Sequence, residues 1–425
     1  MPQFGPALVI LLYFASLATS CTEQDRSSLL QFVTELSQDG GLTGSWKNAT
    51  DCCRWEGIAC NSDMMVTDVS LASWNLRGHI SASLANLTSL LHLNLSHNFL
   101  TGSLPLEFLS SNSIVVLDVS FNQLSGDLQG LQYSDTAQSL QVLNISSNKL
   151  SGALPDELFS ITTLEDVSLH DNQLEGSLCS INKLRDLVSL NLGGNYLSGN
   201  IPDSIGDLRR LEKLRLNHNR LSGELPSSLG KCINLKRINL GFNYFRGELT
   251  KVDFSNLANL KLLDLLQNNF SGTIPESIYS CSNLTALRLS SNKFHGRLSE
   301  RIGNLRSLSF LSLSNNSLTN IKDALEILGS FRNLTTLLIG RNFRDEAMPE
   351  VDMTDAFGNL QVFFLDGCSL SGRIPLWLSK LKKLQMVDLS GNQLSGPIPD
   401  WVSSLHLLFY IDIQTTNSQG RFQQQ

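Results

Sequence analysis

A segment of about two dozen residues recurs along most of the chain, and this recurrence restricts the fold more than any other feature. Three copies fit the pattern LxxLxLxxNxLxGxIP: LLHLNLSHNFLTGSLP at 90–105, LEKLRLNHNRLSGELP at 211–226 and LQMVDLSGNQLSGPIP at 384–399. Its asparagine recurs every 23 to 26 residues, at Asn98, Asn122, Asn148, Asn172, Asn195, Asn219, Asn243, Asn268, Asn292, Asn316, Asn342 and Asn392, with Trp74, Cys368 and Thr416 in irregular copies. Such regularity predicts a solenoid of stacked coils.

Each position of the pattern has a physical role in one coil. The alternation LxL predicts a short strand with leucines inward and the intervening residues outward. The asparagine amide is expected to bond the backbone of its own turn and of the next coil, because each buried polar group left unpaired costs about 1–3 kcal/mol. Glycine supplies turn dihedrals closed to other residues, and proline stands where no ladder N–H is needed. With strands spaced about 4.8 Å apart, about 15 coils give an arc of roughly 70 Å.

The residues before the first repeat indicate a cap. Thr22-Glu23-Gln24-Asp25 fits a capping box, and Leu29, Val33 and Leu36 are predicted to share one helical face. The run CCRWEGIAC at 52–60 follows. Adjacent Cys52 and Cys53 cannot easily bridge each other, so the pairs Cys21–Cys52 and Cys53–Cys60 are predicted.

These features resemble plant leucine-rich-repeat receptor-like proteins. The segments DCCRWEGIACN, LNLSHNFLTGSLP, VLDVSFNQLSG and LQVLNISSNKLSG, with the irregular NLTTLLIGRNFRDEAMPE at 333–350, resemble the phytosulfokine and tyrosine-sulfated glycopeptide receptor group over residues 1–413. The resemblance implies an α/β solenoid: a right-handed leucine-rich-repeat superhelix with a parallel β-sheet on its concave face and a disulfide-bonded N-terminal cap. The expected domains are a signal peptide at 1–20, the cap at 21–64, about 15 repeats at 65–413 with the last incomplete, and a non-repeat tail at 414–425.

Members of this group continue into further repeats, an island domain that contacts the hormone, a C-terminal cap and a membrane helix. The sequence QTTNSQGRFQQQ at 414–425 breaks the pattern, so a truncated receptor product is expected, with a soluble decoy ectodomain as the alternative. Because the island is not in this sequence, the ligand residues of the group are not carried over.

Three features point to export from the cell. The apolar run ALVILLYFASLA at 7–18 ends in small residues and is too short to span a bilayer. The clustered cysteines fit an oxidising compartment, whereas Cys179, Cys232, Cys281 and Cys368 are expected to be buried small hydrophobes. Eight glycosylation sequons occur, at Asn48, Asn86, Asn94, Asn144, Asn269, Asn283, Asn315 and Asn333.

Composition and motifs argue against several other classes of function. Charged residues make up 17% and the net charge is −7, which disfavours nucleic-acid binding. The seven histidines form no HExxH motif and no pairing with a catalytic Ser or Cys, and kinase signatures do not occur. We therefore expect no enzyme, no cofactor and no metal site, and no membrane insertion by this chain.

Function is then expected on the concave strand face. No sequon lies between Asn144 and Asn269, and within that window fall Lys213, Arg215, His218, Arg237 and Phe242, with Asp166, His170 and Arg288 nearby on the same face. Arginine and lysine there are suited to carboxylate or sulfate groups of a peptide. The alternative is that they are ordinary solvated charges.

Two classes of function remain from the sequence. The first is an extracellular module that recognises a secreted peptide, for which the resemblance implies a co-receptor kinase as partner at the plasma membrane. The second is a secreted inhibitor of microbial wall-degrading enzymes, similar to polygalacturonase-inhibiting proteins. A non-functional receptor fragment is the third possibility.

Overall fold

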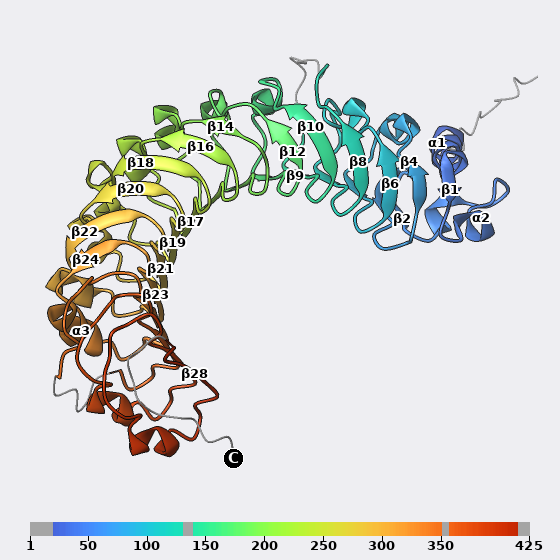
Figure 1. The fold of residues 1–425 in the computed structure, drawn as a ribbon. Coiled ribbons are helices and arrows are strands. Elements are labelled where there is room, and N and C mark those ends of the chain that lie inside the picture. The colour runs from blue at the N-terminus through green and yellow to red at the C-terminus, as the bar shows by residue number, and fades with distance from the viewer. Residues whose placement is uncertain (1–19, 131–138, 351–356, 415–425) are drawn as a thin grey trace, which may run out of the picture.

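The chain winds into one curved solenoid of stacked coils. The computed structural model describes residues 20–130, 139–350 and 357–414, and Figure 1 shows them as an arc with the sheet of short strands on its inner side. The expected signal peptide, apart from residue 20, and the expected tail, apart from residue 414, lie outside the described residues. The proposed domain boundaries therefore stay a prediction.

Within the described residues the concave sheet has 16 strands, of which β2 (Ile58–Cys60) runs antiparallel to β3 and the others run parallel in chain order. These parallel strands are β3 (Val66–Ser70), β5 (His92–Asn94), β7 (Val116–Asp118), β9 (Val142–Asn144), β11 (Asp166–Ser168), β13 (Ser189–Asn191), β15 (Lys213–Arg215), β17 (Arg237–Asn239), β19 (Leu262–Asp264), β21 (Ala286–Arg288), β23 (Phe310–Ser312), β25 (Thr336–Leu338), β26 (Val362–Phe364), β27 (Met386–Asp388) and β28 (Tyr410–Asp412). The parallel concave sheet expected from the LxL alternation is confirmed.

Two further sheets in the described residues lie beyond the concave strands of the coils and end with β24. One contains β1 (Leu36–Gln38), β4 (Arg77–His79), β6 (Phe99–Gly102), β8 (Gln123–Gly126), β10 (Lys149–Ala153) and β12 (Gln173–Glu175). The other contains β14 (Ser198–Gly199), β16 (Arg220–Gly223), β18 (Tyr244–Glu248), β20 (Asn269–Gly272), β22 (Lys293–Arg297) and β24 (Ser317–Thr319). The repeat glycine ends several of these strands, as at Gly223, where φ is +81° and an added Cβ would lie 3.2 Å from the Asn200 side chain.

Short 3-10 helices cover the convex side (Figure 1), for example η7 (Ser227–Lys231) and η12 (Leu376–Lys380). One coil carries an α-helix there instead, α3 (Ile321–Gly329). The carboxylate of Glu346 accepts hydrogen bonds from the backbone N–H groups of Asn320 (2.7 Å) and Ile321 (2.8 Å), and so binds the irregular stretch at 333–350 to the start of α3.

The inward leucines form one continuous core, since every coil covers its neighbour. Leu214, Leu216 and Leu221 of one coil are fully buried. Phe245, Phe270 and Phe294 stack along the solenoid at ring-centroid distances of 6.1 and 6.5 Å. No single coil is able to bury these side chains, and stability therefore depends on the contacts between coils.

The repeat asparagine lies inside the coil, but it bonds the preceding coil and not the next one. The Asn219 side-chain amide donates to the carbonyls of Leu192 (2.9 Å) and Leu216 (3.1 Å). Its oxygen accepts from the N–H of Leu197 at 2.9 Å. Leu192 and Leu197 belong to the preceding coil, toward which the side chain extends. The expected direction was wrong, although the expected type of bond was right.

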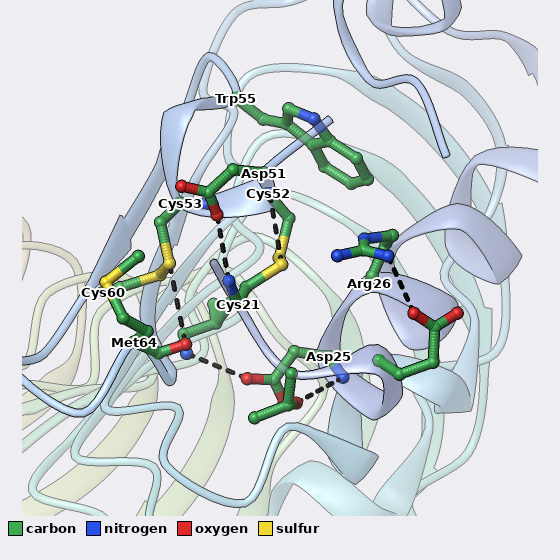
Figure 2. The surroundings of a disulfide bond; sticks show 12 residues. Cys21, Asp25, Arg26, Asp51, Cys52, Cys53, Trp55, Cys60 and Met64 are labelled. Atoms are coloured by element: carbon green, nitrogen blue, oxygen red, sulfur yellow. Dashed lines mark hydrogen bonds and ion pairs between the residues drawn. A yellow bond between two sulfur atoms is a disulfide. The ribbon is translucent and has the colours of Figure 1, made fainter. Parts of the chain in front are cut away.

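The N-terminal cap contains α1 (Glu23–Thr34), α2 (Leu42–Ser45) and η1 (Cys52–Arg54). Thr22 caps α1 by accepting from the N–H of Asp25. The Asp25 carboxylate does not return to the helix; it accepts from the N–H of Val66 at 3.1 Å and fastens the cap to the first coil (Figure 2). Leu36 begins β1 instead of extending α1, so the expected helical face was wrong there.

Disulfides hold the cap closed. The structure joins Cys21 to Cys52 and Cys53 to Cys60 (Figure 2). Between them, one carboxylate oxygen of Asp51 accepts from the N–H groups of Cys21 (2.9 Å) and Cys53 (3.1 Å). These bonds tie the start of α1 to η1, next to which the rings of Trp46 and Trp55 stack.

Candidate ligand-binding face

Outward side chains of the concave strands form two columns along the solenoid. The parallel strands are in register, so the first residues of successive strands are partners, and so are the last residues. From β11 to β28 the first column contains Asp166, Ser189, Lys213, Arg237, Leu262, Ala286, Phe310, Thr336, Val362, Met386 and Tyr410. The second column contains Ser168, Asn191, Arg215, Asn239, Asp264, Arg288, Ser312, Leu338, Phe364, Asp388 and Asp412.

Three cations gather on two adjacent strands. Lys213 and Arg215 flank the buried Leu214 on β15, and Lys213 is the register partner of Arg237 on β17. Lys213 and Arg237 are exposed and Arg215 is half-buried. Within the part of the chain that the structure describes, none of the three has an ion-pair partner within 4.0 Å. We call Lys213, Arg215 and Arg237 the basic patch.

Asp166 lies on the same face, two strands from Lys213 through Ser189. Burial raises the pKa of Asp166, and its hydrogen bond with Ser189 and the charges of Lys213 and Arg215 oppose this rise. The carboxyl group is therefore within electrostatic range of the basic patch and limits it on the N-terminal side.

Arg288 is not a free cation. Its guanidinium contacts the carboxylate of Asp264 at 2.6 Å and lies 5.9 Å from the ring centre of Phe310. Asp264 is buried, and burial raises its pKa against the opposing effects of the Leu266 N–H, Arg288 and His218. This ion pair limits the basic patch on its C-terminal side, with Asp264 one strand and Arg288 two strands beyond Arg237.

His218 and Phe242 do not lie on the strands where the alternation had placed them. Each follows its strand and directly precedes a repeat asparagine, with φ of +54° and +57°. Their rings stack with centroids 4.1 Å apart. They border the basic patch at the edge of the concave face, and their assignment to the strands was wrong because β15 ends at Arg215 and β17 at Asn239. His170 likewise lies beyond β11, where its ring contacts the carboxylate of Asp171 at 2.9 Å.

The sequence reasoning missed this left-handed position. The residue before the asparagine has positive φ in coil after coil: His97, Phe121, Ser147, Asp171, His218, Phe242, Gln267, Ser291, Asn315 and Arg341. The asparagine that follows was the available signal, because its side chain fixes the turn. His97 and Phe121 stack in the same way, at 4.3 Å. A hollow of 350 Å³ beside the His218–Phe242 stack is lined by Tyr196, Arg220 and Tyr244 among others.

The sequons differ in their surroundings. Asn94 and Asn144 are half-buried on the concave strands, and the Asn144 amide donates to Asp118 at 3.1 Å and to Ser120 at 3.2 Å. The other six sequon asparagines are exposed: Asn48, Asn86, Asn269, Asn283, Asn315 and Asn333. Attachment of glycans at any of them stays a prediction.

The four remaining cysteines are unpaired, and one of them corrects an expectation. Cys232, Cys281 and Cys368 are buried, and burial raises the pKa of each thiol to about 11. Cys179 is exposed, with its sulfur 3.1 Å from the Ser177 hydroxyl, and was wrongly expected to be buried. It lies in a turn near η5 (Ile181–Lys183), outside the leucine positions that face the core.

Membrane-spanning helices and metal clusters do not occur in the described residues. No helix there has the length and apolar character that crossing a bilayer requires. No group of three or more His, Cys, Asp or Glu side chains in the same ranges is placed to hold a metal ion.

Family models match most of the chain. A leucine-rich repeat N-terminal domain matches residues 22–61, and a leucine-rich repeat region matches 248–421. Single leucine-rich repeats match 89–111, 139–161, 186–208 and 210–232.

The curated relatives include receptors and receptor-like proteins of Arabidopsis thaliana. Receptor-like protein 3 is 52% identical over 89 residues, which is 20% of this chain and 12% of that protein. Phytosulfokine receptor 1 is 38% identical over 112 residues, 25% of this chain and 11% of that protein. The matched segments thus span only a small part of these relatives.

Solved structures share the solenoid. The plant peptide hormone receptor RGFR1 in complex with RGF2 superposes with a TM-score of 0.71 and 28% identity, over 81% of this chain and 54% of that one. A TDR receptor superposes with a TM-score of 0.68 and 27% identity, over 83% of this chain and 64% of that one. The Leptospira interrogans LRR protein LIC12759 superposes with a TM-score of 0.64 and 27% identity, over 81% of this chain and 84% of that one. The fold therefore also occurs outside plants. From its coils, its cap and these matches, the chain belongs to the leucine-rich-repeat proteins and resembles the ectodomains of plant receptor-like proteins.

Proposed function

We propose that this chain is the extracellular recognition module of a plant receptor-like protein and that its basic patch binds an anionic group of a secreted peptide. The resemblance to receptor ectodomains supports the general class, and one of the similar structures is a plant peptide hormone receptor in complex with RGF2. Signalling through a co-receptor kinase at the plasma membrane is part of the proposal, as the resemblance to this receptor group implies.

One observation carries the proposal: in the described residues none of the three cations of the basic patch has an anionic partner within 4.0 Å, whereas Arg288 in the second column and Arg341 at the edge of the face do. Arg288 is paired with Asp264, and Arg341 with Asp366 at 3.3 Å. Unpaired Lys213 and Arg237 repel each other side by side, and a bound carboxylate or sulfate relieves this repulsion while accepting charge-assisted hydrogen bonds.

The shape of the face favours an extended peptide. An extended chain of about 10 residues spans roughly 33 Å, and adjacent strands are about 4.8 Å apart, so a peptide lying across the strands contacts about seven coils. A peptide anchored on β15 and β17 therefore also passes the Asp264–Arg288 pair.

The test compares peptide binding by wild type and by the triple variant Lys213→Ala/Arg215→Ala/Arg237→Ala. The probes are synthetic 10-residue peptides that end in a tyrosine sulfate, in an aspartate or in a serine, measured by fluorescence anisotropy at low and high salt. The matched control is Lys231→Ala/Arg306→Ala/Lys380→Ala, which removes the same charge from exposed side chains outside the concave strands.

We expect the triple variant to lose at least tenfold in affinity for the anionic peptides and most of the salt dependence, while the control keeps both. The sulfate and aspartate peptides separate the two sources of negative charge. Unchanged affinity in the triple variant would refute the basic patch. Inhibition of a fungal polygalacturonase, with no peptide binding, would instead favour the inhibitor class.

A further inference from the structure

The C-terminal half of the first column is an apolar stripe. Beyond Arg237, register partners continue through Leu262, Ala286, Phe310, Thr336, Val362, Met386 and Tyr410, in which Thr336 and the hydroxyl of Tyr410 are the polar interruptions. All are half-buried except Tyr410, which is exposed, and all point outward from the concave sheet. We call these seven residues the apolar stripe.

The second column widens this stripe near its end. Leu338 and Phe364 are outward and half-buried on β25 and β26, and the Phe364 ring centre lies 6.4 Å from that of Tyr410. An outward apolar surface that continues over adjacent coils is unusual for a solvated sheet face and marks a contact surface. The preceding strands β11 to β17 carry mostly polar and charged residues at the same positions.

Negative charge borders the far end of the stripe. Asp388 and Asp412 follow Phe364 in the second column, and within the described ranges neither has a cation within 4.0 Å. Although Tyr410 is exposed, partial loss of solvent around its hydroxyl raises its pKa, and so do the charges of Asp388 and Asp412, its hydrogen bond with Asp412 and the charge of Asp366, which agrees with these carboxylates lying near the hydroxyl. The concave face thus passes from unpaired cations on β15 and β17, over the apolar stripe with the Asp264–Arg288 pair beside it, to carboxylates on β27 and β28.

We infer that the apolar stripe binds the apolar side chains of an extended peptide whose acidic end lies on the basic patch and whose basic end reaches β27 and β28. This rests on the proposed function and adds the order of chemistry along the ligand. The occupant follows from charge complementarity at both ends and from the continuity of the stripe with the basic patch. From β15 to β28 there are eight strand spacings, about 38 Å, which an extended peptide of about 12 residues covers.

The probes are synthetic 12-residue peptides with blocked ends, labelled with fluorescein. The first has two aspartates at one end, alternating leucine and serine in the middle and two lysines at the other end. The second replaces the lysines by serines, and the third replaces them by aspartates. We expect the first to bind at least fivefold tighter than the second and the third to bind weakest, because only the first matches both charged ends.

Two variants locate the effect on the protein. Val362→Thr/Met386→Gln makes the stripe polar at nearly constant volume and is expected to weaken the first and second peptides by at least fivefold. Asp388→Asn/Asp412→Asn is expected to remove the difference between those two peptides.

Matched controls exist at the opposite end of the same columns. Val116→Thr/Val142→Thr alters two outward, half-buried register partners on β7 and β9. Asp118→Asn alters a carboxylate that accepts from the N–H and hydroxyl of Ser120 at 3.0 and 2.6 Å, as Asp388 does from Ser390 at 2.9 and 2.6 Å. These controls are expected to leave all three affinities unchanged.

The outcomes separate this inference from the proposed function. If the basic-patch variant weakens acidic peptides but the stripe and carboxylate variants match their controls, the inference is wrong and the proposed function stands. If the basic-patch variant has no effect on any peptide, the proposed function itself fails.

Discussion

Replacing the repeat asparagine in one coil tests the basis of the fold. Asn219 is 8% exposed, and its side chain bonds the carbonyls of Leu192 and Leu216 and the N–H of Leu197. In Asn219→Ala these three backbone groups lose that partner in a site that water does not reach. Each buried group left unpaired costs about 1–3 kcal/mol, with partial relief where the loop relaxes, so we expect a loss of about 3–5 kcal/mol in the free energy of unfolding.

The matched control is two residues away in the same coil. Asn217 is half-buried, and no hydrogen bond of its side chain is present within the described residues. Asn217→Ala makes the same chemical change on the concave face, and we expect it to alter the unfolding free energy by less than about 0.5 kcal/mol.

Urea unfolding followed by circular dichroism measures both variants. Because the asparagine joins adjacent coils, its loss is also expected to reduce cooperativity, which appears as a smaller m-value. Equal destabilisation by the two substitutions, or a loss below about 1 kcal/mol for Asn219→Ala, would refute the view that the asparagine amides hold the coils together.

Three further predictions concern the titratable and bonded groups. In the folded protein, exposed Cys179 should react with iodoacetamide. Cys232, Cys281 and Cys368 should react only after unfolding, because they are buried and burial raises the pKa of each thiol to about 11. Peptide mass spectrometry measures the labelling, and modification of the three buried cysteines in the folded protein would contradict the prediction. Because the pKa of Asp264 is raised in the folded state, its stabilising contribution is present below the usual carboxylate pKa and is lost as the pH rises through the raised value. Wild type should therefore lose stability relative to Asp264→Asn over that pH interval, and urea unfolding at a series of pH values would contradict the argument if the sign were opposite. The Cys21–Cys52 bridge joins residues 31 positions apart, and the Cys53–Cys60 bridge joins residues 7 positions apart. Replacing both cysteines of the first bridge by serine should therefore lower the free energy of unfolding by about 3–4 kcal/mol, and the same change in the second bridge by about 2 kcal/mol. Equal shifts of the thermal unfolding midpoint in the two variants would contradict this.

Most of the fold followed from the periodic residues. The leucine alternation defined the inward face of each strand, and the outward positions Lys213, Arg215 and Arg237 could be assigned from it because the side-chain period of a strand is two. This two-residue alternation of side-chain direction ends at the last residue of each strand. His218 and Phe242 lie beyond that point, and their stacking depends on a left-handed backbone that the asparagine imposes, so counting along the strand placed them wrongly.

Other features depended on neighbours in space. Arg288 appeared free in the sequence, but the coil before it brings Asp264 within 2.6 Å. Cys179 was grouped with the buried cysteines by its spacing, yet its turn faces solvent. The Asp25 carboxylate fitted a capping box and instead bonds Val66 in the first coil.

The sequence by itself determined that this chain is a solenoid of leucine-rich coils, because a period of about two dozen residues repeats the same local physics regardless of what surrounds it. Tertiary structure alone decided which charges are unpaired and which side chains form the apolar stripe. Those properties arise between residues about two dozen positions apart in the chain, which only the stacking of one coil on the next brings into contact.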